Sequence, residues 1–413
     1  MEDKTKSIIV VGFNTRPLVY SLKNAGYDVY AVDFFGDLDL YPYVKDSIII
    51  VNALNSNYKS LKDIYSQLLV QFALQLLRRY QDVNFLLIGS GLDNNYEGRQ
   101  LILEEIKTTD IKSVNNEPEI IEKARDIEVI FKFLKSRGYK IPLSYSFEKF
   151  QLQKYSMAYP FILKKKRSAG GINVFKIKDE SNLLSQIKIL EQKKFIPSEW
   201  LIQEYIEGTP VSCTVISNGN ECEIITINRQ IIGEKYLNPP KSFMYCGNIV
   251  PAELLKEEEK MISELSLSLT KNLGLKGING FDFVLKQHYP YFMECNPRIP
   301  GSISASESAL SLNLLDLHIK SFIPKEWKNI EKLIKSAKSS SVVTKLIYFA
   351  PREIDKGILP KINNLDFIYD KSEPTKNVLK GEPLCTILYS AKSFSESFNG
   401  AKKIVNQIES IIE

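Results

Sequence analysis

Residues 291–302, YFMECNPRIPGS, carry more chemical information than any other stretch of the sequence. Side chains of a β-strand alternate between two faces, so Glu294 and Asn296 are expected on one face. Pro297 should end the hydrogen-bonded ladder, and Arg298 then lies in the following loop. A face with two oxygen ligands suits Mg²⁺, which also retains waters and substrate phosphates. Glu294 alone could be a solvent-facing residue, but this spacing predicts a metal–phosphate site.

The residues before this stretch, GINGFDFVLKQHYPYF (277–292), predict an antiparallel strand pair that brings in Asp282. Directly opposed residues of such a pair share a face, and a shift by one residue inverts every side chain. Asp282 and Glu294 can share a metal only if the connecting loop has an odd length or a β-bulge restores the face. We therefore predict that Asp282 opposes Glu294 and that the two carboxylates converge.

A second informative segment is YPFILKKKRSAGGINVFKI, residues 159–177. It predicts a strand ending in Lys164, a basic loop of small residues, and a returning strand. Backbone amides freed by Gly170 and Gly171 can wrap phosphate oxygens, with Ser168 adding a hydroxyl and Lys164 a point charge. By itself the segment could also be a surface hairpin with solvated lysines. A Walker A loop does not occur in the sequence.

The N-terminal part of the sequence predicts a βαβ unit. Two buried-strand patterns, SIIVVGF (7–13) and YDVYAVD (27–33), flank a segment with helix-start and helix-stop residues. Asp33 stands where a dinucleotide-binding fold keeps its ribose-binding acid, but the first turn, GFNTRP (12–17), has one glycine where that fingerprint needs three. We therefore expect a Rossmann-like scaffold rather than a dinucleotide site.

Composition excludes several functional classes. The 413 residues are 44% hydrophobic and 25% charged, with a formal net charge of +5 that is spread along the chain. This pattern is not typical of nucleic-acid binding, and no apolar run is long enough to span a bilayer. Five scattered cysteines and two histidines make a zinc site improbable and fit reduced thiols, so we expect a cytoplasmic protein.

The order of these segments resembles the ATP-grasp superfamily. The strand YPFILK, the loop RSAGGINV, the strand LIQEYIEG and the stretch ECNPRIPGS carry the resemblance, and the last, with the later GEPLCT, is most similar to the carbamoyl-phosphate-synthase-like carboxylate–amine ligase branch. The implied fold is α/β, an α+β ATP-grasp core with flanking domains. The expected domains are a Rossmann-like pre-ATP-grasp domain (1–115), an ATP-grasp domain (116–330) with a nucleotide-covering lid (about 155–207), and a β-rich C-terminal domain with a terminal helix (331–413).

The resemblance also implies cofactors and site residues. ATP and Mg²⁺ are the expected cofactors, with Mn²⁺ as an alternative metal. The metal ligands would be Asp282, Glu294 and Asn296, and Arg298 would be the catalytic, phosphate-stabilising arginine. The nucleotide contacts would be Lys164, Ser168, Gly170, Gly171, Gln203, Glu204, Tyr205, Ile206 and Glu207.

Two features depart from the pattern of the family. An Asp-Lys pair common near the start of the central domain is replaced by Asp126-Ile127, so Arg125 or Lys123 could supply the second phosphate contact. The acid that often binds ribose is replaced by Pro210, which leaves Glu207 as a substitute.

The implied chemistry is ATP-dependent ligation of a small carboxylate to an amine or similar nucleophile, through an acylphosphate. Two alternatives stay open: an enzyme of the same fold that phosphorylates bicarbonate, and a nucleotide-binding module without turnover. We expect no nucleic-acid or membrane partner, and a homodimer is left open. Open sheets bind ligands at the carboxyl ends of their strands, and with the turn after Arg298 this gives the candidate substrate residues Arg16, Ser90, Gly91, Asp93, Gly301 and Ser302.

Overall fold

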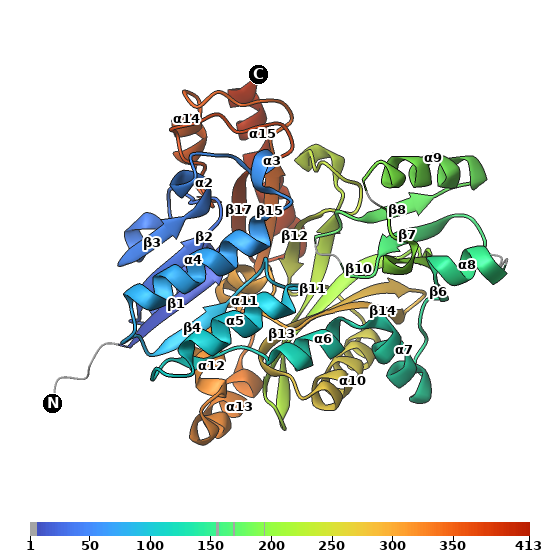
Figure 1. Cartoon of the computed structure of the whole chain (residues 1–413), viewed down its shortest axis with the longest axis horizontal. Helices are drawn as coiled ribbons and strands as arrows, with labels where there is room; N and C mark the ends of the chain where they lie inside the picture. Colours follow the sequence, from blue (N-terminus) through green and yellow to red (C-terminus); the bar gives the residue numbers. More distant parts are fainter. Residues whose placement is uncertain (1–5, 154–156, 168–169, 194) are drawn as a thin grey trace.

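The computed structural model describes residues 6–153, 157–167, 170–193 and 195–413. Its strands form three sheets (Figure 1). The N-terminal sheet is parallel, with the order β3-β2-β1-β4-β5. Its strands are β1 (Ser7–Gly12), β2 (Asp28–Asp33), β3 (Asp46–Ile49), β4 (Phe85–Ile88) and β5 (Lys112–Ser113). Its helices are α1 (Arg16–Asn24), α2 (Ile50–Ala53), α3 (Tyr58–Leu61), α4 (Tyr65–Arg79) and α5 (Tyr96–Ile106), with a 3₁₀ turn at Tyr41–Tyr43.

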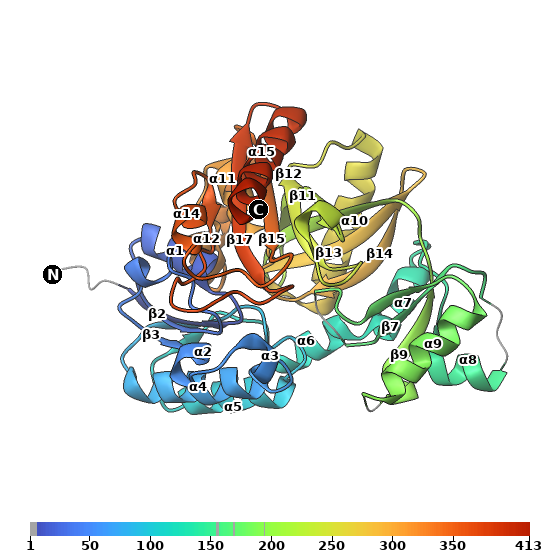
Figure 2. The ribbon, with the colours of Figure 1, turned by 90° about the horizontal axis from the view of Figure 1, so that it is seen from above.

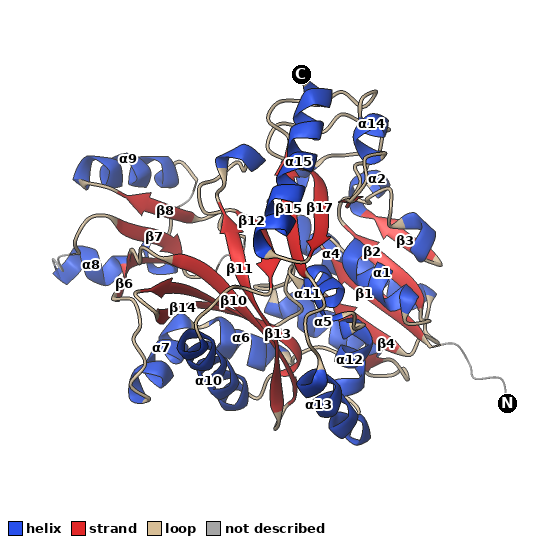
Figure 3. Cartoon of the chain, turned by 180° about the vertical axis from the view of Figure 1, so that it is seen from behind, coloured by secondary structure: helices blue, strands red, loops and turns tan. Residues whose placement is uncertain are grey.

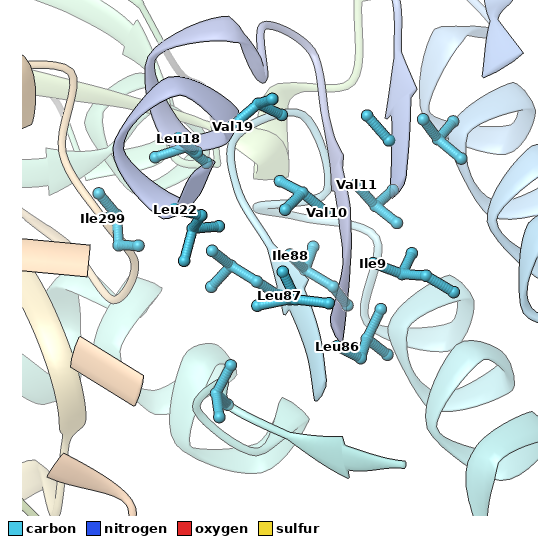
Figure 4. Packing of buried hydrophobic residues seen from close by; sticks show 14 of the residues in the cluster. Ile9, Val10, Val11, Leu18, Val19, Leu22, Leu86, Leu87, Ile88 and Ile299 are labelled. Atoms are coloured by element: carbon cyan, nitrogen blue, oxygen red, sulfur yellow. The ribbon is translucent and has the colours of Figure 1, made fainter. Parts of the chain in front are cut away.

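The core of this N-terminal part reaches the loop after β14. Strands β1 and β4 are buried apolar runs that pack against α1, because a parallel sheet is covered on both faces. Ile299, which follows Arg298, belongs to the same buried cluster as Leu18 and Leu22 of α1 (Figure 4). Apolar packing therefore fixes the loop that carries Arg298 against the N-terminal sheet.

The central sheet has eight strands in the order β14-β13-β10-β11-β12-β15-β17-β16. The strands are β10 (Thr209–Asn218), β11 (Cys222–Ile232), β12 (Tyr245–Val250), β13 (Lys276–Lys286), β14 (Tyr289–Asn296), β15 (Val342–Phe349), β16 (Ile368–Tyr369) and β17 (Pro383–Ala391). Strands β15 to β17 lie within the segment 331–413, so the expected C-terminal domain continues this sheet. Where the domain boundaries fall remains a prediction.

Helices pack on the central sheet and around it. Helix α15 lies along β15 and β17, as the view from behind shows (Figure 3). The helices are α6 (Pro118–Arg125), α7 (Ile127–Ser136), α10 (Lys256–Leu273), α11 (Ile303–Leu310), α12 (Leu314–Ser321), α13 (Trp327–Ser336), α14 (Leu359–Asn363) and α15 (Phe394–Ile412), with 3₁₀ turns at Lys235–Leu237 and Pro324–Glu326. Within the described ranges, no helix combines the length and apolarity needed to cross a membrane.

The third sheet is small and antiparallel, with the order β6-β9-β7-β8. Its elements project to one side of the molecule, away from α4 and α5 (Figure 2). They are β6 (Ser144–Ser146), α8 (Phe147–Gln153), β7 (Phe161–Lys165), β8 (Val174–Ile177), α9 (Glu180–Glu191) and β9 (Trp200–Glu204), with a 3₁₀ turn at Pro197–Glu199. The sheet thus includes β6, which precedes the segment 155–207 expected to form the lid.

The register of β13 and β14 confirms the second of the two predicted arrangements, a bulge in place of an odd-length loop. Asp282 pairs with Glu294, and the register shifts immediately afterwards, between Asp282 and Phe283. The turn consists of two residues, Gln287 and His288, both with positive φ (48° and 65°), as a tight hairpin turn requires. The bulge compensates for the even-length turn, so the two carboxylates oppose each other.

Candidate active site

A cavity of about 1890 Å³, the main cavity, opens between the three sheets. Residues far apart in the sequence line it: Lys164 and Gln203 from the small sheet, Asp282 and Asn296 from the central sheet, and Ser90 from the N-terminal sheet. Most of the predicted nucleotide and metal residues therefore meet in one space. The cavity exceeds the roughly 300–1000 Å³ of a typical ligand pocket, which leaves room for two ligands.

Two of the predicted metal residues, Asp282 and Asn296, are joined by a hydrogen bond, and the third, Glu294, pairs with Asp282 across the strands. Asn296 donates from Nδ2 to Oδ2 of Asp282 at 2.8 Å, and Gln230 donates from Nε2 to Oδ1 of Asp282 at 2.9 Å. Burial and the nearby charge of Glu294 raise the pKa of Asp282 to about 7, while the two amides and Arg298 oppose the rise. A divalent cation would offset this repulsion, so the residues present fit Mg²⁺.

The group is sparse for a metal site made of protein ligands alone. Among the described residues, no three histidine, cysteine, aspartate or glutamate side chains cluster as a metal site. Two carboxylates and an amide oxygen nevertheless match Mg²⁺, which is commonly bound by one or two carboxylates together with substrate phosphates. The donor set therefore suits a metal that arrives with a phosphorylated ligand.

Arg298 lies in the loop after β14 and forms a partly buried ion pair. Its Nε donates to Oδ1 of Asp93, from the loop after β4, and its Nη1 donates to the carbonyl of Ile299 at 3.0 Å. Burial by itself would raise the pKa of Asp93, but Arg298, Arg125 and Arg99 hold it well below its usual range. Asp93 thus supports Arg298 and does not line the main cavity, which favours this pairing over the substrate contact predicted from the sequence.

Two further cations approach the metal residues. The buried Arg125 lies 3.9 Å from Oε1 of Glu294 and donates to the carbonyl of Cys295 at 3.4 Å. It lines the main cavity, whereas Lys123 is exposed and does not, so Arg125 is the better candidate for the second phosphate contact. Burial is the main cause that lowers the pKa of Lys164 to about 8. The positive charge of Arg125 contributes to this lowering, and the negative charge of Glu294 opposes it.

The expected nucleotide-covering residues divide into two groups. Gly170, Gly171 and residues 203–206 line the main cavity. Gly171 has φ +75°, and a side chain there would meet the carbonyl of Phe243 at 1.9 Å, so this close backbone approach requires glycine. Glu207 instead lines a separate, smaller pocket and does not join the site as the sequence suggested. Ser168 lies outside the described residues.

The predicted substrate residues are also divided. Ser90, Gly301 and Ser302 line the main cavity. Gly91 does not, and its amide donates to Oδ2 of Asp93 at 3.1 Å. Arg16 is buried and does not line the cavity either.

Arg16 is held in the N-terminal part by two carboxylates. Its Nε donates to Oδ1 of Asp370 at 2.8 Å and lies 3.4 Å from Oδ2 of Asp39. These ion pairs satisfy the guanidinium within the protein, which favours a structural role over the expected binding of a substrate carboxylate.

Sequence reasoning missed two cavity residues, Gln230 and Lys345. Gln230 bonds to Asp282, and Lys345 on β15 donates from Nζ to the carbonyl of Gly301 at 2.8 Å. Neither stands in a recognisable motif, and only the pairing of β11, β12 and β15 places them beside the metal residues.

The remaining reactive side chains are structural. His318 is buried, accepts a hydrogen bond at Nδ1 from the amide of Ile278 and lies with Nε2 2.9 Å from the carbonyl of Val114. Cys295 belongs to the hydrophobic cluster behind β13 and β14, as expected of a residue between two site residues on a strand. All five cysteines are free and buried.

Comparison with known proteins identifies the class. Residues 125–302 match the family model of the ATP-grasp domain. An uncharacterized protein of Methanocaldococcus jannaschii is 29% identical over 92% of this chain and 87% of its own length. The D-alanine–D-alanine ligase of Flavobacterium psychrophilum is 27% identical over 36% of this chain, and the match spans 44% of that ligase.

Solved structures agree over nearly the whole chain. The N5-carboxyaminoimidazole synthetase of Staphylococcus aureus, complexed with ADP, has a TM-score of 0.65 and 18% identity over 97% of both chains. The L-amino acid ligase of Bacillus licheniformis has a TM-score of 0.68 and 13% identity, also over 97% of both chains. Residues 125–302 are thus an ATP-grasp domain by sequence, and the α/β fold inferred from the sequence is confirmed.

Proposed function

We propose that this protein is an ADP-forming ligase that joins a small carboxylate to an amine or similar nucleophile. The observation that carries the proposal is the convergence of Asp282 and Glu294 across the bulge, in the same cavity as Arg298 and Lys164. Acidic ligands for a metal and cations for phosphates are the parts that phosphoryl transfer needs, since its catalysis consists mostly of positioning and charge stabilisation.

Each residue then has a defined task. Asp282, Glu294 and Asn296 would hold Mg²⁺, and the ion would supply neutralisation of phosphate charge. Lys164 and the glycine loop would bind the phosphates, and residues 203–206, which line the same cavity, would bind the base. The carboxylate attacks the γ-phosphate, which yields an acylphosphate and ADP, and the amine then displaces phosphate. Arg298, fixed by Asp93, faces the charge that develops during transfer.

The size of the cavity is compatible with a ligase, and the names of the relatives include both candidate functions. Several relatives are named for amino-acid ligation, but others are carbamoyl phosphate synthases, and one solved neighbour is a biotin carboxylase domain with MgADP and bicarbonate. Bicarbonate needs only a small site, whereas about 1890 Å³ accommodates a nucleotide together with larger substrates. A module without turnover would have no need of the anchored Arg298.

The test is a screen for ADP release, with carboxylates and amines combined in pairs in the presence of Mg²⁺ and ATP. We expect release that depends on both members of one pair. ADP release with bicarbonate and no other carboxylate would support the second candidate function. Binding of ATP without release in any combination would refute the ligase.

Nucleotide binding should depend on Lys164. Its side chain is partly buried near the end of β7 and lines the main cavity, so Lys164→Ala removes a charge-assisted contact. The affinity for ATP is expected to fall by one to a few kcal/mol, a rough value for such a bond. Calorimetric titration measures it. Lys165→Ala is the matched control, since Lys165 is already paired with Glu199 at 3.0 Å. An unchanged affinity in Lys164→Ala would remove Lys164 from the site.

The same lysine predicts a pH dependence. Only protonated Lys164 attracts phosphate, and burial lowers its pKa to about 8 in the free protein. The affinity for ATP should therefore be retained below pH 8 and weaken as the pH rises above it, by roughly tenfold between pH 7.5 and pH 9. Lys164→Arg keeps its charge over this range and should show a flat profile. A wild-type profile as flat as that of the arginine variant would contradict the prediction.

A further inference from the structure

One end of the main cavity is lined by acceptor groups whose position is not explained by the nucleotide or the metal. Asn14 follows β1, Asp37 follows β2, and Asp370 follows β16, and all three line the cavity. We call this region the carboxylate recess. It lies at the carboxyl edge of the parallel N-terminal sheet, where open α/β sheets bind ligands.

The neighbouring carboxylates already have partners. Asp33 accepts hydrogen bonds at 2.6–2.9 Å from the amides of Thr15, Phe35 and Gly36 and from the hydroxyl of Thr15. Asp39 accepts from the amides of Asp370 and Lys371 at 3.2 and 2.8 Å, and Asp370 accepts from Arg16 at 2.8 Å. These groups build the wall of the recess, and their bonds hold them in place.

Asp37 differs from its neighbours. Over the described ranges, its carboxylate receives a single side-chain hydrogen bond, a long one of 3.4 Å from Nδ2 of Asn14. Burial, and then the charges of Asp370, Asp33 and Asp39, raise the pKa of Asp37 well above its usual range, and Arg16 only partly opposes this rise. The charges around Asp37 are therefore predominantly negative.

The amide of Asn14 supplies an independent sign of the same deficiency. Its Oδ1 is fully buried and has no hydrogen-bond donor among the described residues. A buried acceptor without a donor costs about 1–3 kcal/mol. Asn14 and Asp37 thus both present acceptor capacity in the recess, which indicates a ligand with several N–H groups.

The cations nearby do not fill this role. Arg16 is paired with Asp370 and Asp39. Lys345, a residue that is only 5% exposed, donates a hydrogen bond from its ammonium group to the carbonyl of Gly301. The recess therefore contains four carboxylates, at positions 33, 37, 39 and 370, and two cationic side chains, Arg16 and Lys345. A ligand with one positive charge and several donors would improve this balance.

We propose that the carboxylate recess binds a primary ammonium group, with Asp37 as its counter-ion and Oδ1 of Asn14 as a second acceptor. The proposal rests on the ligase function above and refines it: the amine substrate enters as an ammonium compound of the amino-acid or alkyl-diamine class. A divalent metal fits less well, because it prefers several carboxylate oxygens and Asp370 is already engaged by Arg16.

The test measures binding without turnover. Wild type and Asp37→Asn, each saturated with Mg²⁺ and a non-hydrolysable ATP analogue, are titrated calorimetrically with the protein amino acids and 1,4-diaminobutane. The hydroxyl analogue of each binding amine is the ligand control. We expect at least one amine to bind wild type and to lose at least about tenfold in affinity in Asp37→Asn, as for the loss of a charge-assisted bond.

Glu373→Gln is the matched control, since Glu373 also lines the cavity but already accepts from Asn52 at 3.1 Å. The Glu373→Gln variant should bind the amine with the same affinity as wild type. Asn14→Leu removes the second acceptor and should weaken the amine in the same direction, which keeps the proposal testable if one variant folds poorly. The proposal would be overturned if no amine bound the wild-type protein. It would also be overturned if an amine bound Asp37→Asn as tightly as wild type, or if the hydroxyl analogue bound wild type as tightly as the amine.

These outcomes separate the recess from the ligase. Amine binding that depends on Asp37, without ADP release for any pair of substrates, would refute the ligase and retain the recess. ADP release with an amine whose KM is the same in wild type and Asp37→Asn would retain the ligase and refute the recess.

Discussion

Replacement of Arg298 by alanine is expected to lower kcat for ADP release by about 10² or more, with ATP affinity changed by only a few fold. The reason is its position: Arg298 follows β14, lines the main cavity and is held by its ion pair with Asp93. A group fixed before the reaction stabilises developing charge without reorganising. Steady-state kinetics and calorimetric titration with ATP on the same variant separate the two effects.

Two companion variants sharpen this prediction. Arg298→Lys retains a charge and loses the planar fork, so a large part of the fall should persist. Asp93→Asn retains the guanidinium and weakens its anchor, so kcat should fall by less than in Arg298→Ala. If Arg298→Ala loses ATP binding and keeps its kcat, the arginine is a clamp for the ground state, and its proposed catalytic role is incorrect.

The pairing of β13 with β14 could be predicted from the sequence because the residues that limit its register lie close together in the chain. Strand alternation, Pro297 and the spacing between Asp282 and Glu294 limit the register to an odd loop or a bulge, and the structure contains the bulge. The length of the turn was not predictable in the same way. Gln287 and His288 adopt positive φ, and no Asn-Gly or similar dipeptide announces the two-residue turn.

The partners of the charged residues could not be predicted. Asp93 and Arg298 are 205 positions apart, and Arg16 and Asp370 are 354 apart. Arg16 and Asp93 follow strands, which predicted that they lie near the carboxyl edge of the N-terminal sheet. Their positions did not predict that distant parts of the sequence would supply their partners. Pairing within the protein, rather than with substrate, follows from how the N-terminal sheet packs on the central sheet.

The small sheet shows a similar limit. Its basic loop and the strand before Gly208 were evident, but β6 is a short polar strand, SYS, without an alternating apolar pattern. It belongs to the sheet because Ser144 pairs with Gln203 and Tyr145 with Ile202. Tertiary pairing, not local propensity, determines that this segment is a strand.

Replacement of Glu294, one of the two carboxylates proposed to bind the metal, should have the largest effect on turnover. Glu294→Gln removes one of the two opposed charges proposed to hold the metal, and several kcal/mol of transition-state stabilisation correspond to a fall of about 10³-fold in kcat/KM. The Mg²⁺ concentration needed for half-maximal ADP release should also rise. Titration of wild type and variant with Mg²⁺ measures both quantities, and EDTA should abolish ADP release in wild type.

Asp282→Asn tests the same site from the other strand, with a different expected effect on stability. The repulsion between Asp282 and Glu294, together with burial, raises the pKa of Asp282 to about 7, so the metal-free protein holds an unfavourable charge there. Asparagine removes that charge, and Tm measured in EDTA should stay the same or rise while activity falls as in Glu294→Gln. Two variants that lose activity without any change in the Mg²⁺ requirement would show that these residues do not hold the metal. A lower Tm in EDTA would show instead that Asp282 is a structural hydrogen-bond acceptor for Gln230 and Asn296.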